Sequence, residues 1–311
     1  MDGKIIVTTT ENIVLIIGTC NIGNSIEDEK SEDTNFFVRE QFILETIEKM
    51  NCDILTINEL RPYRNRINGK MCYPSDFLAK IKNYDYIYKY NNATEMSFAN
   101  GILYKRSSVF PIKEVLYWLS KTPEIPSDTW GMGFGRTILG VKFLPVVNQK
   151  IIINAKPIWV YVTHFGIGEE DKNQNVKILP DLIKRDAGED DFIILGDFNF
   201  FEDREREGSK QRSALVESGF VDVGVESYFS FDETKRCYAT FLGFERDSFK
   251  SSYESLSVYS KNSSRLDHIF TSQHIKSSKG IVWAENEEQL INRKTPSDHL
   301  PLICTIEINF I

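Results

Sequence analysis

The sequence predicts a four-layer α/β (α+β) sandwich in which two packed, mixed β-sheets are flanked by helices. Apolar runs of strand length outnumber the helical patterns, and many of these runs lie outside strand–helix–strand units. This arrangement disfavours a simple parallel sheet, so two packed sheets are the expected layered solution. The 311 residues, 41% of them hydrophobic, suffice for one large core. We therefore expect a single domain over residues 1–311.

Eight apolar runs have the length and composition of β-strands. They span residues 13–19, 54–57, 101–104, 137–143, 158–163, 192–195, 266–271 and 302–308. Residues 36–50 and 176–184 instead place apolar residues at helical spacing among charged ones, as Ile43 and Ile47 do in the first segment. The acidic residues 27–33 and the serine-rich residues 248–264 are expected to be surface loops.

The acidic balance of the chain limits its partners. A formal net charge of -8 argues against a broad positive surface for long nucleic acid, although it leaves room for a local basic rim. The five cysteines form an odd set without a Cys-x-x-Cys pair, which suits an intracellular, cytoplasmic location. No apolar run approaches the roughly 20 residues of a membrane helix. We expect neither membrane insertion nor an obligatory protein partner.

Polar residues stand at or just after the ends of the predicted strands. They are Asn21, Glu59, His164, Asp197, Asn199, Asp298 and His299. Asp197 and Asn199 are two residues apart, so both would face one pocket if the extended geometry of their strand continued. Asp298 and His299 lie between two prolines, which stiffen the backbone that presents them. We therefore expect one pocket to collect these side chains.

The chemistry of this residue set favours a hard cation. Carboxylate and carboxamide oxygens suit Mg²⁺ or Mn²⁺, whereas zinc prefers more histidine or thiolate ligands. Such an ion beside a histidine and an aspartate suits attack by water on phosphorus. The residues therefore predict a metal-assisted phosphoesterase, with Mg²⁺ as the first choice and Mn²⁺ as the alternative.

Six motifs in this order resemble the endonuclease/exonuclease/phosphatase superfamily, which has the DNase I-like fold. They are Cys20-Asn21, Asn58-Glu59, Thr163-His164, Gly196-Asp197-Phe198-Asn199, the segment from Arg265 to Phe270, and Ser297-Asp298-His299. Cys20 replaces the usual tryptophan of the first motif, and His268 stands where tyrosine is common. The resemblance covers nearly the whole chain and implies a metal-dependent hydrolase of phosphate esters.

The resemblance also implies a role for each matching residue. Glu59, with help from Asn21 and Asp298, would hold the metal ion.

The remaining matched residues would handle the phosphate. Asp197 and Asn199 would position the water and the phosphoryl group, and His164 would bind a phosphate oxygen. His299 would face the phosphate, while Asp267 would orient it through its ring N–H. Each motif taken alone has a structural alternative: Gly-Asp-x-Asn also forms turns, and Ser-Asp-His also caps helices.

The substrate side of the pocket is less defined by the sequence. Arg61, Asn100 and Arg136 are candidates for substrate binding, because they lie two residues past the metal ligand or at strand starts. A basic run after the metal ligand is interleaved with Tyr63 and Tyr73, and its members are Arg61, Arg64, Arg66 and Lys70. This run is either a phosphate rim or a solvated loop.

Three functions stay open at this stage. The leading hypothesis is a Mg²⁺-dependent phosphodiesterase acting as a nuclease or on a nucleic-acid end. The alternatives are a phosphoesterase for a small-molecule or lipid phosphate, which the acidic charge favours, and a catalytically silent binding module. Subfamily features conflict, because residues 117–123 resemble a microbial branch while residues 203–205 are similar to tyrosyl-DNA phosphodiesterases.

Overall fold

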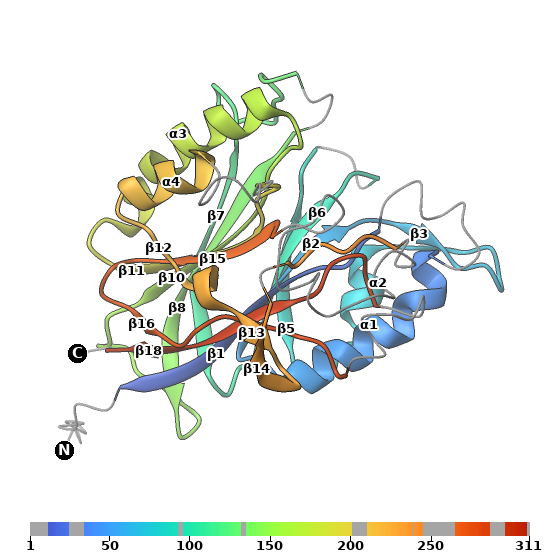
Figure 1. The fold of residues 1–311 in the computed structure, drawn as a ribbon, viewed down its shortest axis with the longest axis horizontal. Coiled ribbons are helices and arrows are strands. Elements are labelled where there is room, and N and C mark those ends of the chain that lie inside the picture. The colour runs from blue at the N-terminus through green and yellow to red at the C-terminus, as the bar shows by residue number, and fades with distance from the viewer. Residues whose placement is uncertain are drawn as a thin grey trace, which may run out of the picture.

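A computed structural model places two β-sheets face to face with helices on both outer sides (Figure 1). It describes residues 12–24, 34–92, 96–131, 135–200, 210–237, 239–244, 265–286 and 296–309. The expected loops 27–33 and 248–264 and the segment 203–205 lie outside this range. Among the described helices, none is both long and apolar enough to cross a membrane. The five cysteines, all within the described part, are unpaired.

The first sheet has nine described strands and is built around β1. Its order is β14-β13-β17-β18-β1-β2-β6-β5, and β16 pairs with β18. The bounds are β1 Ile13–Asn21, β2 Ile54–Leu60, β5 Asp85–Tyr90, β6 Ala99–Tyr104, β13 Tyr228–Phe229, β14 Asp232–Arg236, β16 Lys276–Ser277, β17 Ile281–Val282 and β18 Leu302–Ile308. β1 pairs with β2 in parallel, so both strands end at the same edge of the sheet.

The second sheet has seven described strands and, like the first, contains a parallel strand pair near its centre. Its order is β12-β15-β11-β10-β8-β7, and β9 pairs with β8. The bounds are β7 Val109–Trp118, β8 Thr137–Val147, β9 Lys150–Ile151, β10 Ile158–His164, β11 Asp191–Asp197, β12 Val221–Asp222 and β15 Asp267–Thr271. β10 and β11 are parallel and in register, so His164 is paired with Asp197 where both strands end.

The helices form the two outer layers. α1 Phe36–Met50 and α2 Pro74–Leu78 cover the first sheet, and α3 Glu169–Ala187 and α4 Lys210–Glu217 cover the second (Figure 1). The side chain of Asn35 accepts a hydrogen bond from the backbone N–H of Phe37 and caps α1, and Asn51 ends that helix in a left-handed conformation. A hairpin of β3 Tyr63–Arg64 and β4 Met71–Cys72 follows β2.

Strand alternation divides the core into three apolar layers. On β11, Ile193 and Leu195 face the other sheet, whereas Ile194 packs with α3. On β2, Ile54 faces the inter-sheet layer and Leu55 packs with α1. This division confirms the predicted four-layer sandwich, because each sheet is buried on both faces.

Most predicted elements are present, with differences at the sheet edges. All eight predicted strands and helix 36–50 are confirmed, and the helix predicted over 176–184 extends over all of α3. The prediction missed the long strand β7, which contains Pro111 and a register shift beside it. It also missed β5, whose tyrosine and isoleucine residues are interrupted by Asp85 and Lys89 and are all only partly buried. Both are edge strands, and their partial exposure weakens the apolar pattern that identified the central strands.

Candidate active site between the two sheets

The alternation that builds the inter-sheet core also aims polar side chains into it. Asp197 lies two and four residues after the buried Leu195 and Ile193 and shares their face of β11. In the same way, His164 follows the inward-facing residues of β10, and Asn21 follows those of β1. Because β1, β2, β10 and β11 all end at this edge, the polar set gathers between the sheets. The structure therefore brings these side chains together at one edge of the two sheets.

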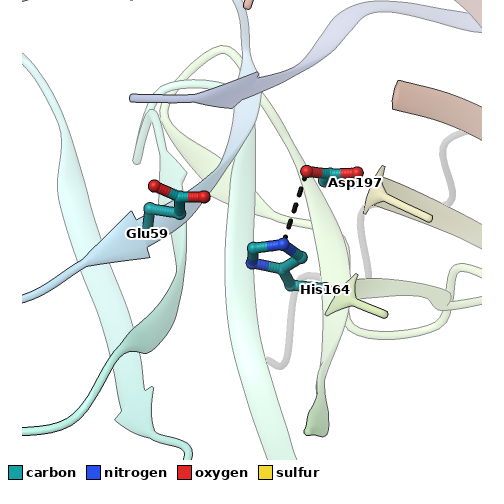
Figure 2. Close-up of side chains that lie close together, drawn as sticks. All are labelled: Glu59, His164 and Asp197. Carbon is teal, nitrogen blue, oxygen red and sulfur yellow. Dashed lines mark ion pairs between the residues drawn. The ribbon is translucent and has the colours of Figure 1, made fainter. Parts of the chain in front are cut away.

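Asp197 is the centre of the polar set. Its Oδ2 accepts a hydrogen bond from Asn21 Nδ2 at 3.0 Å and lies 3.3 Å from His164 Nε2, the contact drawn in Figure 2. The Nε2 atom of His299 is 3.7 Å from the same oxygen. The other carboxylate oxygen accepts the backbone N–H of Asn199 at 2.9 Å. Burial raises the pKa of Asp197, although His299 opposes this shift.

The two histidines beside Asp197 have opposite tendencies. Burial and the nearby Arg136 hold the pKa of His164 well below its usual range, so its ring is neutral near pH 7. Burial also lowers the pKa of His299, but Asp267 and Asp197 outweigh it and the pKa lies well above the usual range. Asp267 Oδ2 is 2.7 Å from His299 Nδ1, which is the contact that the resemblance implied. The two histidines beside Asp197 therefore have pKa values shifted in opposite directions, His164 towards the neutral ring and His299 towards the charged one.

Glu59 lies on a local irregularity of β2. The pairing of β2 with β6 shifts register between Ile57 and Leu60, and Glu59 has a left-handed φ of 63°. Such a backbone is costly for a residue other than glycine and is concentrated at functional sites. Here it accompanies a carboxylate whose Oε1 accepts a hydrogen bond from Asn21 Nδ2 at 3.1 Å. Burial, followed by the charge of Asp298, raises the pKa of Glu59.

Asp298 is held in a tight turn just before β18. Ser297 Oγ donates to the backbone oxygen of Asn21 at 2.7 Å, and the backbone N–H of His299 donates to Ser297 Oγ at 3.1 Å. Gly23, with φ of 58°, packs so closely that an added Cβ would lie 2.4 Å from Asp298 Oδ1. The turn and the segment after β1 therefore fit together only because residue 23 lacks a side chain.

These carboxylates fit a hard divalent cation. Ligand atoms of Glu59, His164 and Asp197 lie within 4.8 Å of one another, and Figure 2 shows the three side chains together. Partial burial, followed by the negative charge of Asp298, raises the pKa of Glu59, and a bound cation would relieve the repulsion between the two carboxylates. Carboxylate oxygens are ligands that Mg²⁺ or Mn²⁺ prefers. The residues present therefore fit the expected metal.

Asn199 does not continue the strand as the two-residue spacing suggested. β11 ends at Asp197, and Asn199 has a left-handed φ of 52°. Its Nδ2 donates to the backbone oxygen of Phe165 at 2.8 Å, while Lys172 Nζ donates to its backbone oxygen at 3.2 Å. The expectation that an extended strand would carry both side chains was therefore wrong. The segment forms a turn around Asp197, and Asn199 is placed by that turn.

The three expected substrate residues occupy different environments. Arg136 is buried, and the charges of Asp197 and Glu59 act on its guanidinium, which places it beside the site. Arg61 is also largely buried, with its guanidinium 5.7 Å from the centre of the Phe98 ring. Asn100 lies between the sheets, where its Nδ2 donates to Thr137 Oγ1 at 3.1 Å.

Asn58, which entered the sequence analysis only as part of a motif, is a buried amide beside the candidate site. Its Nδ2 donates to Asn100 Oδ1 at 2.9 Å and to the backbone oxygen of Thr163 at 3.0 Å. Its Oδ1 accepts the backbone N–H of Asp197 at 3.0 Å. One fully buried amide therefore joins β2 and β6 to β10 and β11 directly behind the pocket. The alternation of side chains along β2 allows the inward position of Asn58 to be predicted from the sequence, but the partners of Asn58 come from three distant strands.

Arg39 is the second residue that the sequence argument missed. Its guanidinium, buried on α1, donates to the backbone oxygens of Ile22, Gly23 and Pro296. It therefore holds together the two segments that carry Asn21 and the Asp298 turn. A charged residue within an amphipathic helix gives no sequence sign of such a role.

Two packed sheets with carboxylates and histidines between them define a protein of the DNase I-like fold. A model of the endonuclease/exonuclease/phosphatase family matches residues 18–299, so the chain belongs to this family, whose members are phosphoesterase hydrolases. The resemblance drawn from the six motifs is confirmed by this match.

Known proteins similar to this chain differ in what they act on. The uncharacterized protein L388 of Acanthamoeba polyphaga mimivirus is 29% identical over 274 residues, which are 86% of this chain and 91% of that protein. The Bacteroides thetaiotaomicron mannosyl-6-phosphatase Bt3783 has a TM-score of 0.70 at 19% identity, with 94% and 99% of the two chains covered. D. rerio TDP2 bound to a single-stranded DNA product has a TM-score of 0.60 at 14% identity, with 95% and 99% covered. At 19% and 14% identity, the likeness of these two structures to this chain shows a common fold.

Proposed function

We propose that this protein is a Mg²⁺-dependent phosphodiesterase that acts as a nuclease or on a nucleic-acid end. The observation that carries the proposal is the buried contact set around Asp197, with two histidines and Asn21 on one carboxylate. Beside it lies Glu59 within reach of a shared cation. Water attack on a phosphodiester needs a base, a donor to the developing negative charge and a metal, and this set supplies groups for all three.

Each residue of the set has a defined task in the proposed reaction. Asp197 orients a water molecule and accepts its proton, a task helped by the raised pKa of its carboxyl. The new bond from the water oxygen to phosphorus forms as the ester bond opposite to it breaks. His299, kept charged by Asp267, donates to a phosphoryl oxygen as negative charge develops. His164, which is neutral, contributes a second ring N–H.

Glu59, with Asp298 and Asn21 beside it, would hold the metal ion. When bound, the ion neutralises charge on the phosphoryl group and lowers the pKa of bound water. Asn21 also donates to Glu59 and to Asp197, so its amide fixes the spacing of the two carboxylates. The buried Arg136 adds a fixed positive charge beside them, which favours an anionic substrate.

A phosphatase of small-molecule or lipid phosphates is the second candidate. The formal net charge of -8 favours it, because a long polyanion would be repelled by most of the surface. The same fold carries a mannosyl-6-phosphatase, which shows that it accommodates a small phosphomonoester. Both candidates use the same residues, so they differ in substrate and share the chemistry.

Hydrolysis assays distinguish these candidates. The purified protein is tested with and without Mg²⁺ on labelled single-stranded DNA, double-stranded DNA, RNA, bis-p-nitrophenyl phosphate and p-nitrophenyl phosphate. We expect Mg²⁺-dependent cleavage of at least one polymer and of the small diester, and loss of both in Asp197→Ala. His299→Ala should lose the same activities, and His274→Ala is its matched control, because His274 is exposed and lies near Asp191 at the opposite end of β11. Cleavage of the monoester alone would favour the second candidate, and a fully active Asp197→Ala would refute the assigned site.

A further inference from the structure

A compact hairpin adjoins the candidate site and concentrates positive charge. It comprises residues 61–73, directly after Glu59 and the end of β2. The segment contains Arg61, Arg64, Arg66 and Lys70 and no acidic residue, in a chain whose net charge is -8. Arg64, Arg66 and Lys70 are exposed. The charge of this hairpin is therefore opposite to that of the molecule as a whole.

The hairpin is held rigidly on the body of the protein. Tyr63 is buried at its base, where its ring lies 4.7 Å from that of Phe36 and its hydroxyl donates to Glu40. Tyr63 is thus an anchor, which corrects the idea that it interleaves with the basic residues as a stacking surface. β3 and β4 pair through Tyr63 with Cys72 and through Arg64 with Met71.

The tip of the hairpin is equally well ordered by its own hydrogen bonds. The backbone N–H of Asn65 donates to the oxygen of Lys70 at 2.9 Å, and Gly69 returns a bond to Asn65 at 2.8 Å. The side chain of Asn65 accepts from the N–H of Ile67 at 2.9 Å. Arg64 Nη1 donates to the oxygen of Gly69 at 2.8 Å, and Arg64 is exposed to solvent. Such a preformed tip binds a ligand with little ordering cost.

We infer that this hairpin binds the phosphates of a nucleic-acid strand outside the scissile bond. The inference rests on the proposed function and adds the element that selects a polymer. Seven residues separate Glu59 from Arg66, a span of at most about 24 Å in an extended chain. The basic side chains can therefore meet several consecutive phosphates that lead away from the site. A local arm of this kind also explains how an acidic protein could hold a polyanion.

The charge of the hairpin predicts how binding depends on salt. Each phosphate contact to a single strand contributes about 0.7 to the slope of log K against log salt concentration. Replacing Arg64, Arg66 and Lys70 together by glutamine should therefore reduce the slope by about 2, so that the affinity difference between the two proteins shrinks by about 20-fold between 50 and 200 mM salt. These three side chains are exposed, so the replacement leaves the buried anchor of the hairpin intact.

The test measures binding of a labelled 12-nucleotide single-stranded DNA by fluorescence anisotropy between 50 and 300 mM KCl. All proteins carry Asp197→Ala, so that cleavage does not interfere. The matched control removes the same charge at the opposite end of the sheets, by Lys150→Gln, Lys276→Gln and Lys279→Gln. We expect the slope to fall only in the hairpin variant. A double variant with Arg64→Lys and Arg66→Lys should keep the slope, because it keeps the charge.

Several outcomes would overturn the inference. An unchanged slope in the hairpin variant, or an equal fall in the control, would show that the hairpin makes no phosphate contacts. A fall in the arginine-to-lysine variant would show that the loss is not one of charge. If the hairpin variant keeps its DNA binding but loses binding to phosphatidylglycerol vesicles, the arm serves a lipid surface. Hydrolysis of bis-p-nitrophenyl phosphate by the unmodified protein tests the proposed function separately.

Discussion

Replacing Asn58 by alanine should be among the most damaging single changes near the site. The substitution removes three hydrogen bonds and leaves three buried partners unpaired: the N–H of Asp197, the backbone oxygen of Thr163 and Oδ1 of Asn100. Each bond contributes about 1 kcal/mol net, and a buried group left unpaired costs about 1–3 kcal/mol. The free energy of unfolding should therefore fall by about 3 to 9 kcal/mol, out of a typical 5–15 kcal/mol for a whole protein.

Urea denaturation at pH 7 measures this loss, and hydrolysis of bis-p-nitrophenyl phosphate by the folded variant measures its effect on the site. We expect at least a tenfold lower rate, because Asp197 loses the bond that fixes its backbone. Asn12→Ala is the control, since the side chain of Asn12 makes an exposed contact with Glu307. A loss below about 1 kcal/mol for Asn58→Ala, or no difference from Asn12→Ala, would refute the reasoning that this amide joins the sheets.

Three further changes test separate contacts. Arg39→Met should lower the free energy of unfolding by about 3 kcal/mol or more, because it removes the guanidinium donors of four backbone oxygens, and urea denaturation would measure this. Gly23→Ala should raise the Mg²⁺ concentration needed for half-maximal hydrolysis, because the added Cβ displaces Asp298. An unchanged Mg²⁺ concentration would contradict a role for Asp298 in holding the metal. For Asp222, burial raises the pKa, but Arg265, His268 and Arg212 outweigh it and hold the pKa well below its usual range. Its stabilisation is therefore present above an unfolded pKa of about 3.9 and lost as pH falls towards the folded pKa. The stability gap between the unmodified protein and Asp222→Asn should be constant from pH 5 to 7 and shrink below about pH 4 in urea titrations.

A buried cluster of charged side chains surrounds Asp222, away from the candidate site. Arg265 Nη2 lies 2.7 Å from Asp222 Oδ2, and both side chains are buried. His268 Nδ1 is 3.5 Å from the same oxygen, and its ring stacks on Phe270. His268 therefore packs on the helix side of β15, opposite to the face that carries Asp267.

The sequence alone determined the central part of the fold and predicted which residues form the candidate site. Central strands are buried on both faces, so their apolar runs are continuous and their ends are marked by the first polar residue. Because side chains alternate along a strand, Asp197 and His164 could be assigned to an edge of the sheet before their neighbours were known. The contact between Asp267 and His299 was inferred from the family resemblance, and the structure shows it.

The tertiary structure alone decided how these residues are held. The partners of Asn58 come from β6, β10 and β11, and those of Arg39 from segments more than 250 residues apart. Spacing along the chain carries no information about such contacts, because they depend on how the two sheets pack. The left-handed backbone of Glu59 and Asn199 could not be predicted from the sequence either, because local preference disfavours this conformation and only the surrounding packing maintains it.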